Sequence, residues 1–372
     1  MSLTNSAESR FLLSDLTGVV NTLPNQYGFI NSLNLFSVRP QTQTTFLLDL
    51  TKTDISLLDP VSRAGHKAES QASEVVSQIA FPLITFKDVE SIVPEELQGV
   101  RQAGTVATPE TEARLRAVKL AKVRSRFDIT KEFLKMQALK GKVKDANGKL
   151  WLDMYAQFGV AKAAPFEFML DDPSFDIDGK IEELKRHMED NAGFGTLING
   201  EDIIVLVDAK FFNAFTNHAK IRDAYLAQQN PLAWQQMTAS LRTGGSDGVQ
   251  QNMNMFRYRG LTLIQYNGKF KNNAGVDQIL VKVDQAVSGG NTLVGSGHAF
   301  PNQTMVPDND LFQMAYAPCA KMGYANTAGQ ELYVFEYERD RDEGIDFEAH
   351  SILMPFCTRP QLLVDLAYVT KP

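Results

Sequence analysis

The chain has 372 residues, more than a single compact core usually holds, so we expect two or three lobes. Hydrophobic residues make up 44% of the chain and charged residues 22%, as in an ordinary folded protein, and no run of about 18 apolar residues occurs, which excludes a membrane-spanning helix. The N-terminus lacks the pattern of a secretory signal and the only two cysteines are Cys319 and Cys357, so we expect buried free thiols in a cytoplasmic protein.

The N-terminal quarter of the chain favours extended structure. Residues 1–30 are polar and mixed, which is typical of an arm. Two β-favouring runs follow, at residues 36–59 and 73–86, and the residues between them, 59–66, favour a turn. Together the two runs predict a long two-stranded ribbon. Such a ribbon cannot bury enough surface to be stable alone, so we expect it to lie on another body, often a second subunit.

A long helix is predicted next. Thr108 can cap it, Pro109 suits its first position and Gly141 is a natural stop, which gives a helix of about 30 residues. Its apolar residues form two stripes, which indicates a strut with a broad buried surface. Lys119, Lys122 and Arg126, at spacings i, i+3 and i+7, line a basic strip beside them.

Charge is unevenly distributed around this helix. Residues 114–144 carry eleven basic and two acidic side chains, a net charge of +9, so the rest of the chain sums to −16. A basic segment on an acidic body indicates weak, sequence-independent contact with polyanions or pairing with acidic neighbours in an assembly. A solvated helix face is the alternative, and composition alone favours it.

The remaining two thirds of the chain read as a mixture of helices and strands. Asn147-Gly148 between alternating residues predicts a hairpin. The other expected elements are helices at residues 181–190 and 210–229 and strands at 203–207, 261–266, 278–283, 331–337 and 362–369.

No catalytic, cofactor or metal site is predicted. Gly295-Ser296-Gly297-His298 lacks the spacing of a nucleophile elbow and is predicted to lie in a surface loop spanning residues 289–309. Residues 244–248 lack the ending of a phosphate-binding loop, and the five histidines lack a zinc-binding spacing. Two arginines are interleaved with the acidic residues of 338–344, which favours ion pairing over a metal cage. These observations favour a protein that is not an enzyme.

Short sequence signatures in a fixed order resemble one protein family. The N-terminal signatures are Leu23-Pro24-Asn25-Gln26-Tyr27-Gly28, Leu33-Asn34-Leu35-Phe36, Leu57-Leu58-Asp59-Pro60 with Arg63-Ala64-Gly65, and residues 94–101. The most specific block is residues 138–143 followed by Asp145-Ala146-Asn147-Gly148 and Asp153. Later signatures are Ala317-Pro318, Asn326-Thr327-Ala328-Gly329, Tyr333, His350-Ser351, Pro355 and Arg359-Pro360. In this order they resemble the phage lambda-type major capsid proteins, the major capsid protein E family.

The resemblance implies an α+β fold of the Hong Kong 97 type, the fold shared by the capsid proteins of tailed phages. It implies an N-terminal arm (1–36), an extended loop (37–90), a peripheral domain with a long spine helix (91–185), an axial domain (186–330) and return strands of the peripheral domain (331–372). On this mapping the tip of the ribbon contacts a neighbouring subunit through Ile55, Leu57, Leu58, Val61 and Arg63.

The same resemblance implies a function and partners. Hexamers and pentamers would close into an icosahedral shell around double-stranded DNA, in the virion of a tailed phage or prophage, after assembly in the cytoplasm of the bacterial host. A portal, a scaffold and a decoration protein are implied as partners, with weak non-specific contact with the packaged DNA and no contact with a membrane. Two alternatives stay open: an encapsulin-like protein compartment and an enzyme of unidentified class.

Overall fold

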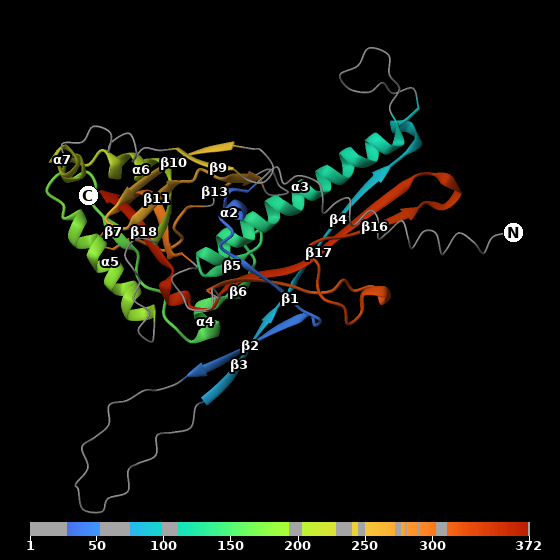
Figure 1. Ribbon diagram of the computed structural model, residues 1–372, viewed down its shortest axis with the longest axis horizontal. Helices are drawn as coiled ribbons and strands as arrows, with labels where there is room; N and C mark the ends of the chain where they lie inside the picture. Colours follow the sequence, from blue (N-terminus) through green and yellow to red (C-terminus); the bar gives the residue numbers. More distant parts are fainter. Residues whose placement is uncertain are drawn as a thin grey trace, which may run out of the picture.

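The computed structural model contains two sheets of different size, connected by one long helix (Figure 1). The structure describes residues 28–52, 75–98, 111–192, 203–227, 240–244, 250–271, 277–279, 281–288, 290–302 and 311–370. No helix within these ranges is both long and apolar enough to cross a membrane.

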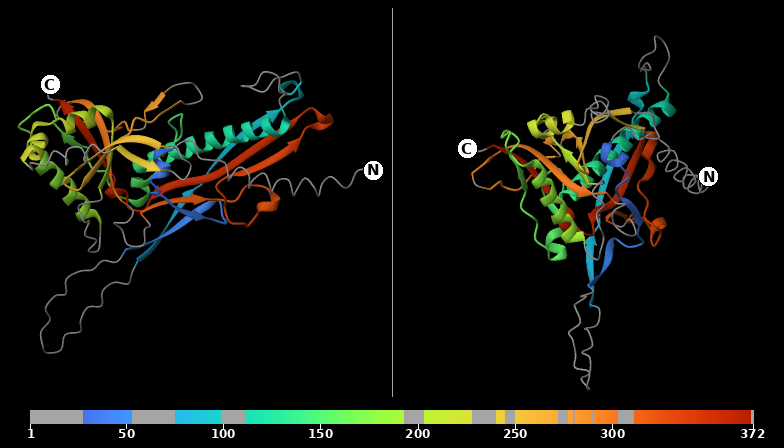
Figure 2. Two further views of the ribbon diagram at one scale, coloured as in Figure 1. Left: turned by 45° about the horizontal axis from the view of Figure 1, so that its top comes forward. Right: turned by 60° about the vertical axis from the view of Figure 1, so that its left-hand side comes forward.

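A five-stranded sheet forms one end of the molecule. Its strand order is β1 (Ser37–Pro40), β15 (Phe312–Tyr316), β17 (Ile345–Cys357) and β16 (Tyr333–Glu338), and β4 (Ile84–Ile92) also pairs with β17. The central strand, β17, has 13 residues and pairs antiparallel with β4, β15 and β16. The helix α3 (Glu112–Leu139) runs along this sheet (Figure 2).

A seven-stranded sheet forms the other end. Its order is β7 (Phe166–Phe168), β18 (Val364–Thr370), β14 (Thr292–Pro301), β8 (Ile203–Val207), β11 (Leu261–Gln265), β10 (Gln250–Tyr258) and β9 (Ser240–Gly244). The helices α5 (Ile177–Ala192), α6 (Ala209–Thr216) and α7 (Ala219–Ala227) accompany this sheet in Figure 1.

Smaller elements complete the structure. Three two-stranded ribbons are formed by β2 (Thr45–Lys52) with β3 (Val75–Pro82), β5 (Lys142–Lys144) with β6 (Leu150–Asp153), and β12 (Lys269–Lys271) with β13 (Asp277–Ile279). Among the described residues, the short helices are α2 (Phe29–Ser32) and α4 (Met154–Phe158), with 3₁₀ turns at Pro94–Glu96, Met322–Tyr324, Asp340–Asp342 and Pro360–Leu362.

Local chemistry explains both ends of α3. At its start, the hydroxyl of Thr111 accepts a hydrogen bond from the backbone N–H of Arg114. The described helix therefore begins with Thr111 as its cap, three residues after the predicted cap Thr108, which lies outside the described residues. At its end, Gly141 has a φ of +80°, a conformation that favours glycine, and the chain turns there as predicted.

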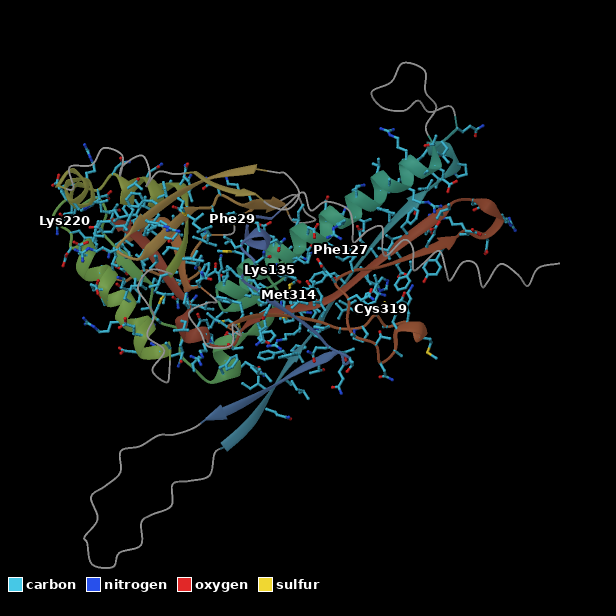
Figure 3. The ribbon with its side chains drawn as sticks, in the orientation of Figure 1. Phe29, Phe127, Lys135, Lys220, Met314 and Cys319 are labelled. Atoms are coloured by element: carbon cyan, nitrogen blue, oxygen red, sulfur yellow. The ribbon has the colours of Figure 1, made fainter. Side chains whose placement is uncertain are left out.

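The hydrophobic core divides along α3. Leu120, Val123 and Phe127 in its first half pack against residues of β16 and β17, among them Val334 and Phe347. Figure 3 labels Phe127 on this part of α3. Leu134, Met136 and Leu139 in its second half belong to a larger cluster that extends through both sheets. The helix therefore connects the two sheets as a buried strut, although Val118, one of its apolar residues, is exposed.

Most of the predicted elements are present. The hairpin at Asn147-Gly148, the helix at 181–190 and the strand at 203–207 correspond to β5–β6, α5 and β8. The predicted helix at 210–229 is divided into α6 and α7. Cys319 and Cys357 are buried free thiols, as expected.

The surface loop predicted at residues 289–309 is wrong for residues 292–301, which form β14, while residues 303–309 lie outside the described residues. Gly295 to His298 lie in β14, an inner strand of the seven-stranded sheet, between β18 and β8. The glycines allow close packing there, because a Cβ on Gly295 would lie 2.9 Å from the backbone nitrogen of Phe211 and one on Gly297 would lie 2.8 Å from Cγ1 of Val207.

The two sheets do not follow the residue ranges that the resemblance implied. β15, from the range 186–330, lies in the five-stranded sheet, whereas β7 and β18, from the ranges 91–185 and 331–372, lie in the seven-stranded sheet. The chain therefore passes between the sheets more often than a division into consecutive segments allows.

Candidate interaction surfaces

The root of the β2–β3 ribbon is anchored in the core by aromatic side chains. Phe46 and Phe81 are cross-strand partners in the ribbon. The ring of Phe81 stacks on Phe356 of β17 at 4.8 Å between centroids, and the ring of Phe46 lies 4.9 Å from Phe356. Phe158 of α4 lies 6.0 Å from Phe81 on another side. These contacts fix the direction in which the ribbon leaves the body.

The other face of the ribbon is open to solvent. Because side chains alternate along a strand, Leu47 and Ala80 point away from Phe46 and Phe81. Leu47 is 50% exposed, and Gln78, Ala80 and Pro82 are exposed as well. In Figures 1 and 2 the ribbon projects from the body of the molecule. It is therefore a two-stranded element with one anchored end and one face that is exposed in the described part of the chain.

The predicted ribbon tip cannot be placed. Ile55, Leu57, Leu58, Val61 and Arg63 lie in residues 53–74, outside the described residues. Sequence reasoning named this tip and missed the anchor at the root. The alternation of Ile79 and Phe81 with Gln78 and Ala80 was the available signal for an anchored face, whereas Phe46 is followed by two further apolar residues.

The basic strip of α3 lies against β4 and the turn that follows it. Lys119 pairs with Glu96 at 2.6 Å and also donates to the carbonyl oxygen of Ser91. Lys122 pairs with Glu90 at 2.8 Å. Arg126 pairs with Asp88 and with Glu90, both at 2.8 Å. The three cations of the strip therefore have carboxylate partners within their own chain.

These ion pairs also shift the pKa values of the side chains that form them. Although burial opposes it, Lys122, Arg126 and Lys119 hold the pKa of Glu90 below its usual value. A hydrogen bond to Asp88 raises the pKa of Arg126. The side chains of Lys122 and Arg126 are still 55% and 45% exposed, so the strip presents cations to solvent beside the anions that balance them.

The second half of α3 carries charges inside the protein. Lys131 is buried and pairs with Asp128 at 2.6 Å and with Glu331. Glu132 is buried and accepts hydrogen bonds from the Tyr266 hydroxyl at 2.6 Å and from the Ile30 backbone. The net charge of +9 predicted for residues 114–144 is therefore not a uniform surface charge, because part of it is enclosed.

No metal site is found within the described ranges, where no three histidine, cysteine, aspartate or glutamate side chains are grouped suitably for an ion. Arg339 of the acidic segment 338–344 forms an ion pair with Asp346, two residues beyond the segment, at 2.8 Å. In the described residues, the ribbon and the basic strip offer surfaces for contact.

Comparisons with known proteins give a consistent result. The sequence model of the family described as phage major capsid protein E matches residues 13–367. The major capsid protein of Salmonella phage Felix O1 (isolate Felix O1-VT1) is 61% identical over 365 residues, which is 98% of each chain. The major capsid protein of Pseudomonas phage KPP10 is 28% identical over 370 residues, which is 96% of this chain and 97% of that protein.

Solved structures agree in fold. A candidate capsid protein of a prophage from E. coli CFT073 superposes with a TM-score of 0.57 at 14% identity, over 96% of this chain and 98% of that one. A subunit of the mature capsid of bacteriophage PhiM1 gives a TM-score of 0.50 at 8% identity, over 94% of this chain and 90% of that one. At these identities the likeness shows the fold alone, which is the capsid fold of the Hong Kong 97 type.

Proposed function

Since the chain belongs to the phage major capsid protein E family, we propose that the β2–β3 ribbon is its principal contact with neighbouring subunits. The chain is a major capsid protein of a tailed phage, a structural protein and not an enzyme, and it assembles into a multimeric shell, the virion capsid. Neither the encapsulin-like compartment nor the enzyme is favoured by the relatives found.

The observation that carries this proposal is the contrast between the two ends of the ribbon. At the root, Phe46 and Phe81 are buried against Phe356. Farther out, Leu47 faces solvent, and the sequence continues into the apolar residues of the tip, Ile55, Leu57, Leu58 and Val61. Apolar surface buried against a neighbour contributes about 25 cal/mol per Å², so a ribbon of this kind suits an intersubunit contact.

The finer features of the assembly are part of the same proposal. Hexamers and pentamers form the shell, and residues 1–36 act as an arm. The five-stranded sheet with α3 acts as the peripheral domain and the seven-stranded sheet as the axial domain, an assignment supported by the strand pairing. Assembly takes place in the cytoplasm of the bacterial host, with a portal, a scaffold and a decoration protein as partners.

Contact with the packaged DNA is proposed to be weak and non-specific. The exposed Lys122 and Arg126 provide cations, but Asp88 and Glu90 lie within ion-pair distance of them. Such balanced charge leaves little net attraction for phosphate groups, which suits DNA that must move during packaging.

Replacing residues 55–69 with an Asn-Gly turn tests the role of the ribbon. The variant should unfold at nearly the same temperature as the unassembled native subunit, because the root anchors remain, but it should form no regular shells in negative-stain microscopy. As a control, exposed apolar residues away from the ribbon, Val89 and Val118, are changed to serine. Normal shells from the tip variant would refute the proposal.

A further inference from the structure

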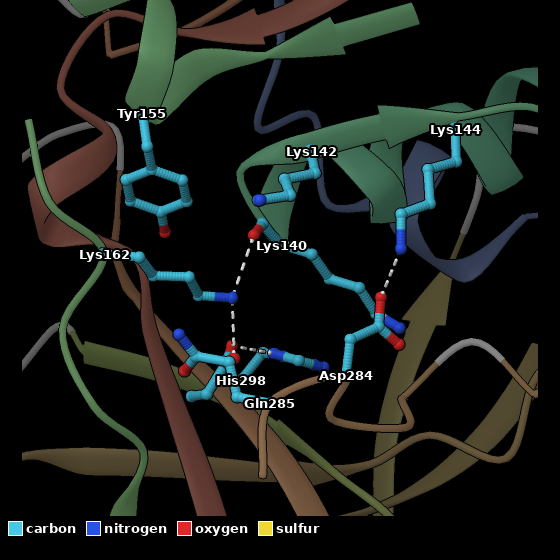
Figure 4. Close-up of a pocket in the computed structure, with 9 residues that line it drawn as sticks. Lys140, Lys142, Lys144, Tyr155, Lys162, Asp284, Gln285 and His298 are labelled. Atoms are coloured by element: carbon cyan, nitrogen blue, oxygen red, sulfur yellow. Dashed lines mark hydrogen bonds and ion pairs between the residues drawn. The ribbon is translucent and has the colours of Figure 1, made fainter. Parts of the chain in front are cut away.

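A cavity of about 370 Å³ lies where the end of α3 meets the seven-stranded sheet. Its walls carry Lys140, Lys142, Lys144 and Lys162 together with Asp284 and Asp365. In Figure 4, Lys162 reaches into the cavity from the left and Lys144 from the right, with His298 below them. A cavity of this size is at the lower end of the range of small-molecule sites.

Three of the four lysines have a carboxylate partner. Lys142 pairs with Asp153 at 2.8 Å and Lys144 pairs with Asp284 at 2.9 Å. Lys162 pairs with Asp365 at 2.6 Å. In each pair the positive charge of the lysine is balanced by the negative charge of its carboxylate, so these three pairs add no net charge to the cavity.

Lys140 is different, because no carboxylate of the described residues lies within 4.0 Å of its ammonium group. Its Nζ donates a hydrogen bond of 2.7 Å to the carbonyl oxygen of Lys282, and the residue is only 6% exposed. Burial lowers the pKa of Lys140 to about 8, although the carboxylates of Asp284 and Asp365 across the cavity oppose this shift. A buried ammonium that no carboxylate contacts directly is unfavourable. An anion in the cavity would supply that direct contact.

His298 provides a second, independent indication. It is 1% exposed, and its Nδ1 lies 2.8 Å from Oδ1 of Asp365. Its Nε2 is buried and has no hydrogen-bond partner among the described residues. Burial lowers the pKa of His298, so the ring is neutral near pH 7 and donates from Nδ1 to Asp365. Nε2 is then a free acceptor that requires a donor in the cavity.

We infer that this cavity binds a compact oxyanion that still carries a proton, such as hydrogen phosphate. Its charged oxygens lie against the ammonium of Lys140, and its hydroxyl donates to Nε2 of His298. No bond is made or broken. Sulfate has the same shape but has no proton at neutral pH, so it leaves Nε2 without a partner.

The position of the cavity gives the bound ion a structural role. Lys140 and Lys144 belong to the end of α3 and to β5, whereas His298 and Asp365 belong to β14 and β18. An ion that contacts both Lys140 and His298 therefore stabilises the junction between α3 and the seven-stranded sheet. Because both residues are buried, the phosphates of a DNA duplex cannot reach them without opening of the protein.

Thermal unfolding of the full-length protein tests the inference. At pH 7.5 and constant ionic strength, the Tm should rise by about 2 °C for each tenfold increase in phosphate above its Kd. Sulfate should raise it less. In Lys140→Met the phosphate-dependent rise should disappear, and in the control Lys185→Met, whose lysine pairs with Glu182 on α5, it should remain. An equal rise in Lys140→Met and the native protein would overturn the proposal.

Titration calorimetry of the native protein decides the matter if Lys140→Met does not fold. Phosphate should bind with a stoichiometry of one per subunit, and sulfate, acetate and a short DNA duplex should not displace it. Equal binding of sulfate and phosphate, or no binding of phosphate, would contradict the assignment. Displacement by acetate or DNA would point to a carboxylate or a phosphodiester as the ligand and would equally overturn it.

Discussion

Phe81 of β3 stacks on Phe356 of β17, with 4.8 Å between the ring centroids and 15° between the ring planes. This contact joins a projecting ribbon to the central strand of the five-stranded sheet. The root of the ribbon is therefore part of the subunit's own core, whereas the face that carries Leu47 is exposed. If the ribbon contacts neighbouring subunits as proposed, separate substitutions should change the stability of the subunit and the assembly of the shell.

Phe81→Ala should lower the free energy of unfolding by about 3–5 kcal/mol, because it removes a buried ring and leaves a cavity beside Phe356. Leu47→Ala, on the opposite face of the same ribbon, should change it by no more than about 0.5 kcal/mol. Urea unfolding of the unassembled subunits measures both values. Equal losses of unfolding free energy in the two variants would contradict a ribbon whose Phe81 face is buried and whose Leu47 face is exposed.

Gly141 and Gly148 offer a matched pair of backbone substitutions. Both have a positive φ, +80° and +84°. A Cβ on Gly141 would lie 2.3 Å from the ring of Tyr155, whereas a Cβ on Gly148 would meet nothing within 4 Å.

Gly148→Ala should therefore cost about 1 kcal/mol, the conformational penalty alone. Gly141→Ala should cost several times as much, because Tyr155 is buried and its ring has to move. Thermal unfolding of the two variants measures the difference. Similar losses in both would mean that Tyr155 adjusts without cost.

Local sequence patterns predicted the elements whose stability is mainly local. The Asn147-Gly148 turn and the apolar run at 203–207 are of this kind, and both were placed correctly. β14 was missed because Gly295 and Gly297 have low strand propensity, and the strand is fixed by β8 and β18 on its two sides. β17 was missed as well, since Pro355 within it argues against a strand.

The ion pairs of the basic strip could not be predicted from one sequence. The spacing of Lys119, Lys122 and Arg126 placed them on one side of a helix, as the structure has them. Their partners Asp88, Glu90 and Glu96 lie more than 20 residues earlier, on another element. Only the packing of α3 on β4 brings the two sets together, and that packing depends on the whole sheet.

Glu132 should make the stability of the subunit depend on pH. Burial raises its pKa, although hydrogen bonds from Tyr266 and Ile30 oppose the rise. For an acid whose pKa is raised by folding, the stabilising contribution is present below the unfolded-state pKa and is lost as the pH rises through the folded-state value. Glu132→Gln keeps an acceptor for the Tyr266 hydroxyl and removes the buried charge.

As the pH is raised from about 4 to about 8, the native protein should therefore lose stability relative to Glu132→Gln. The free energy of unfolding of the variant, minus that of the native protein, should increase over this range. The control Glu183→Gln, at an exposed position on α5, should show a much smaller change. Urea titrations across this pH range provide the test. A native protein that gains stability relative to Glu132→Gln as the pH rises would contradict the direction of the shift.

The basic strip allows charge contact with DNA to be separated from stability. Changing Lys119, Lys122 and Arg126 to glutamine removes three cations, and Glu90→Gln removes the anion shared by Lys122 and Arg126. Both variants break ion pairs, so both should lower subunit stability, by no more than about 1 kcal/mol per exposed pair, and less at high salt.

Their effects on DNA should have opposite signs if the strip faces the packaged genome. The triple variant should release DNA from particles more readily at high salt, whereas Glu90→Gln should hold it more firmly, because Lys122 and Arg126 then lack a shared counter-ion. Genome retention is measured by nuclease sensitivity of purified particles across a salt series. If both variants lose DNA in proportion to their loss of stability, the strip contributes only to the packing of α3 on β4.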